Sequence, residues 1–207
     1  MMKHTIITIG RQFGSGGHEV GNRLAERLDI PLYDHNLIRM AAQELRISSE
    51  DATQVDETIL GRFLTAYIVS TGNYTAFMSG DESGEPLSDL VFNRQSAIIR
   101  KLAEKGPGIF VGRCADYVLR EDPYCINVFI HSNLESRKRR AIEEYGVDRE
   151  DAEDILIKTD KRRANYYNYY TDRKWGKAEN YHIAIDSSRF ELEEIAEMIA
   201  QLVKSKQ

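Results

Sequence analysis

Near its N-terminus the chain reads Thr5-Ile6-Ile7-Thr8-Ile9-Gly10-Arg11-Gln12-Phe13-Gly14-Ser15-Gly16-Gly17. The stretch 5–9 is β-branched throughout, which is typical of a buried strand. After the glycines, Val20, Leu24 and Leu28 recur at helical spacing with charged residues between them. The sequence therefore predicts a strand, a glycine-rich loop and an amphipathic helix in direct succession.

The glycine-rich loop is suited to bind a phosphate group. Glycines allow several main-chain N–H groups to point at one anion, and the positive end of the following helix adds to the attraction. The alternative is an ordinary tight turn between a strand and a helix, for which fewer glycines suffice. Four glycines lie within residues 10–17, and this number favours anion binding.

Short apolar stretches alternate with amphipathic stretches along the rest of the chain. Further strands are expected at 30–33, 109–111, 125–130 and 181–185, and helices from about residue 36, over 87–104, and after capping boxes that begin at Ser132 and Ser188. This alternation predicts an α/β fold, in which a parallel sheet carries helices on both faces. Ligands of such folds bind at the carboxyl ends of the strands, which here are the loop after Ile9 and the turns at Asp34, Gly112-Arg113 and Ser132.

The composition restricts the class of protein. A length of 207 residues favours a single domain, and a total of two cysteines excludes a disulfide scaffold. No apolar run approaches the roughly 20 residues of a membrane span, and the N-terminal apolar stretch is too short for a signal peptide, so we expect a cytoplasmic protein. The formal net charge of −5 argues against nucleic-acid binding over the whole surface, but it allows a local basic pocket for a phosphorylated small molecule.

The loop lacks the lysine of a standard P-loop. The pattern Gly-x-x-x-x-Gly-Lys-Ser/Thr places a lysine directly after its last glycine. Here Gly17 takes that position if Gly16 is the anchor, and His18 and Glu19 follow. Arg11, at the mouth of the loop, is the nearest cation that could replace the lysine. The alternative is that Arg11 is a surface arginine paired with an acid.

Charged side chains also follow the other expected strands. Asp34 ends the second strand and Arg39 lies further along the next helix, so they could hold a sugar or base and a phosphate, although Asp34 could equally cap that helix. Arg113 directly follows a buried strand, and we expect it in the cleft as a phosphate contact. Asp116 could pair with Arg113, hold a hydrated metal or cap a helix, and both Asp116 and Asp160 are candidates for an indirect Mg²⁺ contact. The five histidines lack the spacing of a zinc site.

Two basic clusters lie in the C-terminal half of the chain. Residues 137–140 crowd the start of a helix, where positive charges oppose the helix dipole unless an anion compensates. The second cluster precedes a tyrosine-rich stretch at 165–170 and a loop at 172–176, and it consists of Lys158, Lys161, Arg162 and Arg163. A mobile basic lid that closes over phosphates suits phosphoryl transfer, in which positioning and charge neutralisation dominate.

This order of motifs resembles the cytidylate kinase family of P-loop nucleoside monophosphate kinases, and more closely its divergent cytidylate kinase-like branch. The likeness spans nearly the whole chain and is most specific at Gly10–Glu19, Tyr33-Asp34, Val111-Gly112-Arg113 and Tyr169–Gly176. The resemblance implies a three-layer P-loop NTPase fold with a parallel sheet, as a single domain over residues 1–207. It also implies a helical monophosphate-binding insert at about 46–95 and a lid at about 145–178.

The resemblance further implies transfer of the γ-phosphate of ATP to a small-molecule nucleotide, CMP or dCMP, with Mg²⁺ as a cofactor. The residues that bind ATP are then Gly14, Ser15, Gly16, Gly17, His18 and Glu19. The catalytic residues are Arg11, Arg162 and Arg163, and the nucleoside monophosphate is bound by Asp34, Arg39, Arg113 and Asp116. No residue is assigned as a direct metal ligand. The family's Gly-Lys-Gly-Thr is Gly16-Gly17-His18-Glu19 in this chain. Arg11 would therefore have to supply the positive charge of the missing lysine.

Two other functions stay open. The missing lysine and the presence of Glu19 suit a regulatory protein that binds nucleotide or phosphate with little catalysis. The unfamiliar insert suits a kinase of another small molecule. We expect neither nucleic acid nor a membrane as a partner. The apolar residues of the insert form either its core or a face of a homo-oligomer, and they are Phe63, Leu64, Tyr67, Ile68 and Phe77.

Overall fold

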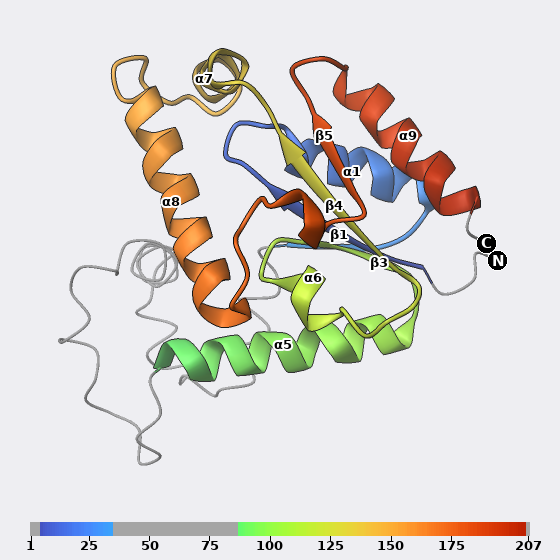
Figure 1. The fold of residues 1–207 in the computed structure, drawn as a ribbon. Helices are drawn as coiled ribbons and strands as arrows, with labels where there is room; N and C mark the ends of the chain where they lie inside the picture. Colours follow the sequence, from blue (N-terminus) through green and yellow to red (C-terminus); the bar gives the residue numbers. More distant parts are fainter. Residues whose placement is uncertain (1–4, 35–86, 206–207) are drawn as a thin grey trace, which may run out of the picture. The chain divides into compact units, whose positions relative to one another are not determined.

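Five parallel strands form one sheet in the order β2-β3-β1-β4-β5 (Figure 1). The computed structural model describes residues 5–34 and 87–205. The strands are β1 Ile6–Arg11, β2 Leu32–Tyr33, β3 Gly108–Val111, β4 Cys125–His131 and β5 Ile183–Asp186. β1 is central because it pairs with β3 on one side and with β4 on the other, which places Ile9 opposite both Val111 and Val128. The predicted α/β fold with a parallel sheet is confirmed.

The chain divides into two compact units, residues 1–34 with 99–207 and residues 35–98. The helices of the first unit are α1 Gly17–Leu28, α6 Ala115–Val118, α7 Leu134–Glu143, α8 Ala152–Thr171, the short 3₁₀ helix Ala178–Asn180 and α9 Leu192–Ser205. α5, Leu87–Lys105, begins in the second unit and ends in the first. α1 packs on α9, and α7 packs on α8 beyond the carboxyl end of the sheet (Figure 1).

The apolar core forms between the sheet and the α1–α9 pair. Ile7 and Ile9 of β1 are fully buried, and the helical stripe predicted for α1 is buried at Val20, Leu24 and Leu28. α9 contributes Leu192, Ile195, Ile199 and Val203 to the same cluster, and Leu202 packs against it partly buried. The core therefore fixes the N-terminal part of α1, and with it the loop that joins β1 to α1.

Two predicted helix starts are wrong in detail. The N-cap of α7 is Asn133, whose side chain accepts a hydrogen bond of 2.8 Å from the amide of Ser136. Ser132 is not the cap because its hydroxyl has no hydrogen-bond partner among the described residues, and its main-chain N–H donates to the side chain of Gln12. Ser188 likewise binds the carboxylate of Asp186 and does not cap α9.

Some strand limits also differ from the prediction. β2 consists of Leu32–Tyr33 alone, and β5 begins at Ile183, two residues later than expected. Tyr181 instead packs its ring against Phe129, with ring centroids 4.7 Å apart. The helix expected from about residue 36, Arg39, the apolar residues 63–77 and most of the expected insert lie outside the described residues. No described helix is long and apolar enough to cross a membrane.

Candidate phosphate-binding site

The loop between β1 and α1 presents main-chain donors at the carboxyl end of the central strand. Gly14 and Gly16 have left-handed φ angles of 75° and 77°. Within residues 5–34 and 87–205, the amides of Gly14, Gly16 and Gly17 donate to no other group. A Cβ on Gly14 would lie 2.7 Å from the carbonyl oxygen of Arg137, and one on Gly17 would lie 2.5 Å from Cβ of Arg11. The glycines are therefore required both by backbone conformation and by close packing.

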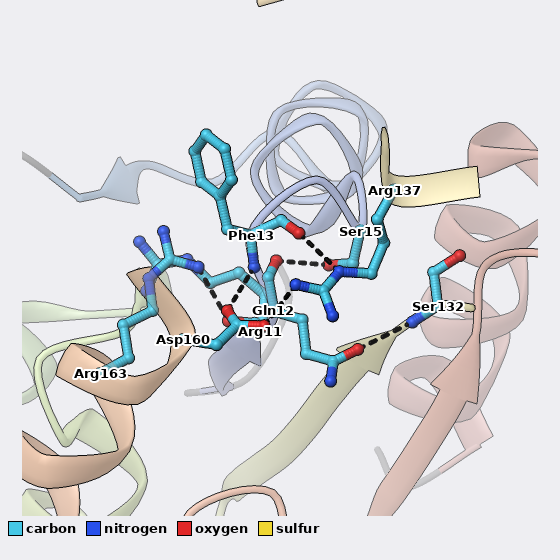
Figure 2. A network of polar contacts seen from close by, with 8 residues as sticks. All are labelled: Arg11, Gln12, Phe13, Ser15, Ser132, Arg137, Asp160 and Arg163. Atoms are coloured by element: carbon cyan, nitrogen blue, oxygen red, sulfur yellow. Dashed lines mark hydrogen bonds and ion pairs between the residues drawn. The ribbon is translucent and has the colours of Figure 1, made fainter. Parts of the chain in front are cut away.

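The carbonyl groups of the same loop are held by side chains from other elements (Figure 2). Arg163 of α8 donates to the carbonyl of Arg11 at 3.0 Å, and Arg137 of α7 donates to that of Phe13 at 2.8 Å. Arg140 donates to the carbonyl of Gly14 at 3.0 Å, and the hydroxyl of Ser187 donates to that of Ser15 at 2.6 Å. Because the carbonyls are occupied in this way, the loop offers mainly N–H groups to a ligand.

Three arginines meet beside the loop. The side chain of Arg11 passes Gly17 and reaches Gly112, where a Cβ would lie 3.1 Å from Cζ of Arg11. The pKa of Arg11 is lowered, first by burial and then by the positive charges of Arg163 and Arg113. Burial also lowers the pKa of Arg163 to about 10. Asp34 and Asp160 oppose the lowering of the Arg11 pKa but do not cancel it, so a bound anion beside Arg11 would favour its charged form.

The turn that carries Arg113 has a strained backbone. Gly112, Arg113 and Cys114 have consecutive φ angles of 76°, 59° and 55°. A left-handed conformation at a residue other than glycine raises the energy by about 1–3 kcal/mol, and such residues concentrate at ligand sites. The strained turn keeps Arg113 at the carboxyl end of β3, where sequence analysis expected it.

His18 and Asp34 come together across the start of α1. Nε2 of His18 lies 2.5 Å from Oδ2 of Asp34, and Nδ1 faces the side-chain amide of Asn22 at 3.4 Å. Because Asn22 can only donate through its nitrogen, Nδ1 accepts and Nε2 donates to the carboxylate. His18 therefore orients the carboxylate of Asp34 at the carboxyl end of β2.

Glu19 lies in the first turn of α1, directly after His18. The hydroxyl of Tyr145 donates to its Oε1 at 2.6 Å, and its Oε2 is buried without a hydrogen-bond partner in the part of the chain that the structure describes. Carboxylate oxygens are hard ligands of the type that Mg²⁺ prefers. Glu19 is thus the described residue of α1 that fits such an ion.

Two predicted site residues are placed differently. Asp116 is buried and accepts a hydrogen bond of 2.7 Å from the hydroxyl of Tyr167 on α8, and burial raises its pKa. It thus joins α6 to α8, and no contact with Arg113 supports the pairing considered above. Asp160 pairs with Arg137 and accepts from the amide of Phe13. Arg162 forms no hydrogen bond or ion pair among the described residues, and Arg39 lies outside them.

Sequence reasoning missed the roles of Arg137, Arg140 and Gln12. The side chain of Gln12 accepts from the amide of Ser132 and so joins the loop to the end of β4. Arg137 and Arg140 are three residues apart on α7, as Asp160 and Arg163 are on α8, which puts each pair on one helix face. This spacing was a usable signal that one face of each helix is directed at a common target.

A model described as the cytidylate kinase-like family matches residues 6–189. The crystal structure of an uncharacterized protein from Eubacterium ventriosum is 30% identical, with a TM-score of 0.72, and the match covers 97% of this chain and 99% of that chain. These two findings confirm the family that the motifs suggested.

Two more distant structures have the same fold. Shikimate kinase from Acinetobacter baumannii, in complex with shikimate, is 16% identical with a TM-score of 0.51, and the match covers 99% of this chain and 95% of that one. A gluconokinase from Sinorhizobium meliloti is 15% identical with a TM-score of 0.54, covering 99% and 94%. The expected P-loop NTPase fold is therefore confirmed. No curated protein matches the chain.

Proposed function

The chain belongs to the cytidylate kinase-like family, and on that premise we propose that it is a phosphotransferase that moves the γ-phosphoryl group of ATP to a small acceptor. One observation carries the proposal. The main-chain amides of Gly14, Gly16 and Gly17 lie at a helix N-terminus, next to a positively charged cluster formed by Arg11, Arg113 and Arg163. Such donors and cations can bind a polyphosphate and neutralise the charge of the transferring group.

Different residues bind the phosphates of ATP, neutralise the charge of the transferring group and hold Mg²⁺ in this proposal. The loop amides and His18 at the start of α1 hold the phosphates of ATP. Arg11 supplies the charge that the missing lysine would carry, and Arg163, which reaches the loop from α8, stabilises the transferring phosphoryl group together with Arg162. Mg²⁺, when bound, would shield the phosphate oxygens, and Glu19 is the side chain that fits it because one of its carboxylate oxygens is buried and unpaired among the described residues.

A nucleoside monophosphate, CMP or dCMP, is the acceptor we propose. Its phosphate would bind Arg113, whose strained turn holds the side chain at the edge of the sheet, and Asp34 would contact the sugar or base. The segments at about 46–95 and 145–178 would serve as the monophosphate-binding insert and the lid of a single domain. A phosphate acceptor needs no strong base, so Asp34 acts in binding.

An alcohol acceptor is the second candidate. Unlike a phosphate, a hydroxyl group must lose a proton as it attacks, and a carboxylate within reach is a suitable acceptor for that proton. Asp34, oriented by His18 at 2.5 Å, is such a group. This arrangement favours a small-molecule kinase over a protein that only binds nucleotide.

An acceptor panel tests the proposal. The purified protein is incubated with γ-labelled ATP and Mg²⁺ and with nucleoside monophosphates, dCMP, or unphosphorylated alcohols that include shikimate. We expect label to be transferred to CMP or dCMP. The Arg163→Gln variant, purified in parallel, should lose the transfer, which excludes a co-purifying kinase. Transfer only to an alcohol would favour the second candidate, and ATP binding without any transfer would overturn the proposed activity in favour of a regulatory protein.

A further inference from the structure

A closed ring of polar contacts surrounds the main chain of Phe13 (Figure 2). The amide of Phe13 donates to Oδ1 of Asp160 at 2.8 Å, and its carbonyl accepts from Nε of Arg137 at 2.8 Å. Nη2 of Arg137 and Oδ2 of Asp160 form an ion pair that closes the ring. Both polar groups of one loop residue are thus held by a charged pair whose members come from α7 and α8.

The pair is buried, so its geometry is tightly determined. The side chains of Arg137 and Asp160 are 9% and 14% exposed. Burial raises the pKa of Asp160, while the Phe13 amide and the charge of Arg137 oppose that shift. If one partner is removed, the other is left as an uncompensated charge in a site with little access to water. Arg137 and Asp160 therefore hold the main chain of Phe13 as a pair, and we expect the loss of either side chain to weaken both contacts.

The orientation of Phe13 determines where the next amide points. The described chain contains no cis peptide bond, and in a trans peptide the C=O and the following N–H point in opposite directions. Because Arg137 holds the Phe13 carbonyl, the N–H of Gly14 is turned away from the guanidinium group of Arg137. Ser187 has the same effect one step further along, because it holds the carbonyl of Ser15 and thereby directs the N–H of Gly16.

We propose that Asp160 and Arg137 are positioning residues that set the loop in its phosphate-binding shape before any nucleotide arrives. The inference rests on the proposed function, because it concerns the same loop. It adds that the affinity of the loop for phosphate depends on α7 and α8 being in place, although neither Asp160 nor Arg137 contacts the ligand. Binding then proceeds without a separate step that orders the loop.

The same two helices provide a matched control. Nζ of Lys138 on α7 lies 3.0 Å from Oε2 of Glu153 on α8, in a pair that touches no loop residue. Substitution of Glu153 therefore removes an α7–α8 ion pair and leaves the ring around Phe13 intact. A difference between Asp160→Asn and Glu153→Gln isolates the effect on the loop from a general loosening of the two helices.

The experiment compares the full-length ligand-free wild type, Asp160→Asn and Glu153→Gln by backbone ¹⁵N relaxation and by ATP titration. We expect residues 13–17 to be rigid in the wild type and in Glu153→Gln, with order parameters of about 0.85, and to fall below about 0.6 in Asp160→Asn. ATP affinity should fall by about tenfold in Asp160→Asn alone, since a displaced binding group far from the chemistry has effects of this size or larger. Identical loop order and affinity in the two variants would overturn the inference.

A second substitution covers the case in which Asp160→Asn does not fold. Arg137→Lys keeps the positive charge beside Asp160 but loses the planar group that donates to Phe13 and Asp160 at once. It should lower the order parameters of the loop, whereas an unchanged loop would contradict the inference. Failure of the wild type to bind ATP would count against the proposed function only, because the relaxation measurement decides the positioning role without nucleotide.

Discussion

The surroundings of Arg11 disfavour the positive charge of its guanidinium group. The side chain is half-buried beside Arg163 and Arg113, and among the described residues it forms no hydrogen bond or ion pair. The lowered pKa means that folding disfavours the charged form of this side chain. The full penalty is present at a pH below the lowered pKa, where the group is charged, and it relaxes as the pH rises through that pKa. A bound anion would relieve this repulsion.

We therefore predict opposite effects of Arg11→Met on stability and on activity. Methionine keeps much of the aliphatic volume and removes the charge, so the free energy of unfolding at neutral pH should stay equal to that of the wild type or rise. The turnover number should fall by about tenfold or more, because a donor aimed at the transferring phosphate is lost. Chemical denaturation and initial rates measure the two quantities.

The exposed arginine of α7 supplies the control for this substitution. Arg139→Met removes the same charge from the surface and should change neither the stability nor the turnover noticeably. If Arg11→Met destabilised the fold and left turnover unchanged, Arg11 would be a packing residue and would have to be removed from the mechanism.

At the level of secondary-structure elements, the β1 loop is built by contact with α7. A Cβ on Gly14 would lie 2.7 Å from the carbonyl oxygen of Arg137, whereas one on Gly146, in the connection between α7 and α8, meets nothing within 4 Å. Both glycines have left-handed φ angles, 75° and 66°. The two positions therefore share the backbone requirement and differ in the close approach of a helix.

Alanine at these two positions should separate the two requirements. Gly146→Ala should lower the free energy of unfolding by about 1–2 kcal/mol, the strain of a left-handed residue with a Cβ. Gly14→Ala should lower it further, since α7 or the loop must move, and should abolish ATP binding. Urea denaturation and ATP titration of both variants test this, and equal losses of stability with ATP binding retained would contradict the role given to the loop–α7 contact.

Local pattern sufficed to predict most elements but not their ends. The stripe of Val20, Leu24 and Leu28 identified α1 because helical spacing of apolar residues is a local property. Ser132 carried the expected capping pattern, yet the side chain that accepts from the amide of Ser136 belongs to the next residue, Asn133. Serine and asparagine are both common N-caps, so the local sequence did not decide between these neighbours and the cap was assigned one residue too early.

At the scale of the whole molecule, a chain with a formal net charge of −5 concentrates positive charge at one end of its sheet. The sequence indicated this edge because the glycine-rich loop and Arg113 follow predicted strands, and parallel strands end at a common edge. It could not indicate which cation meets which loop atom. Asp160 accepts from the amide of Phe13 across 147 positions, so its contact with the loop emerges only from the folded chain.

The most direct test is a crystal structure of the full chain with Mg²⁺ and a non-hydrolysable ATP analogue at saturating concentration. The account predicts phosphate oxygens within hydrogen-bond distance of the amides of Gly14, Gly16 and Gly17, with the guanidinium group of Arg11 or Arg163 at the terminal phosphate. An analogue bound elsewhere, or a loop whose amides stay unoccupied while the analogue is in excess, would contradict it.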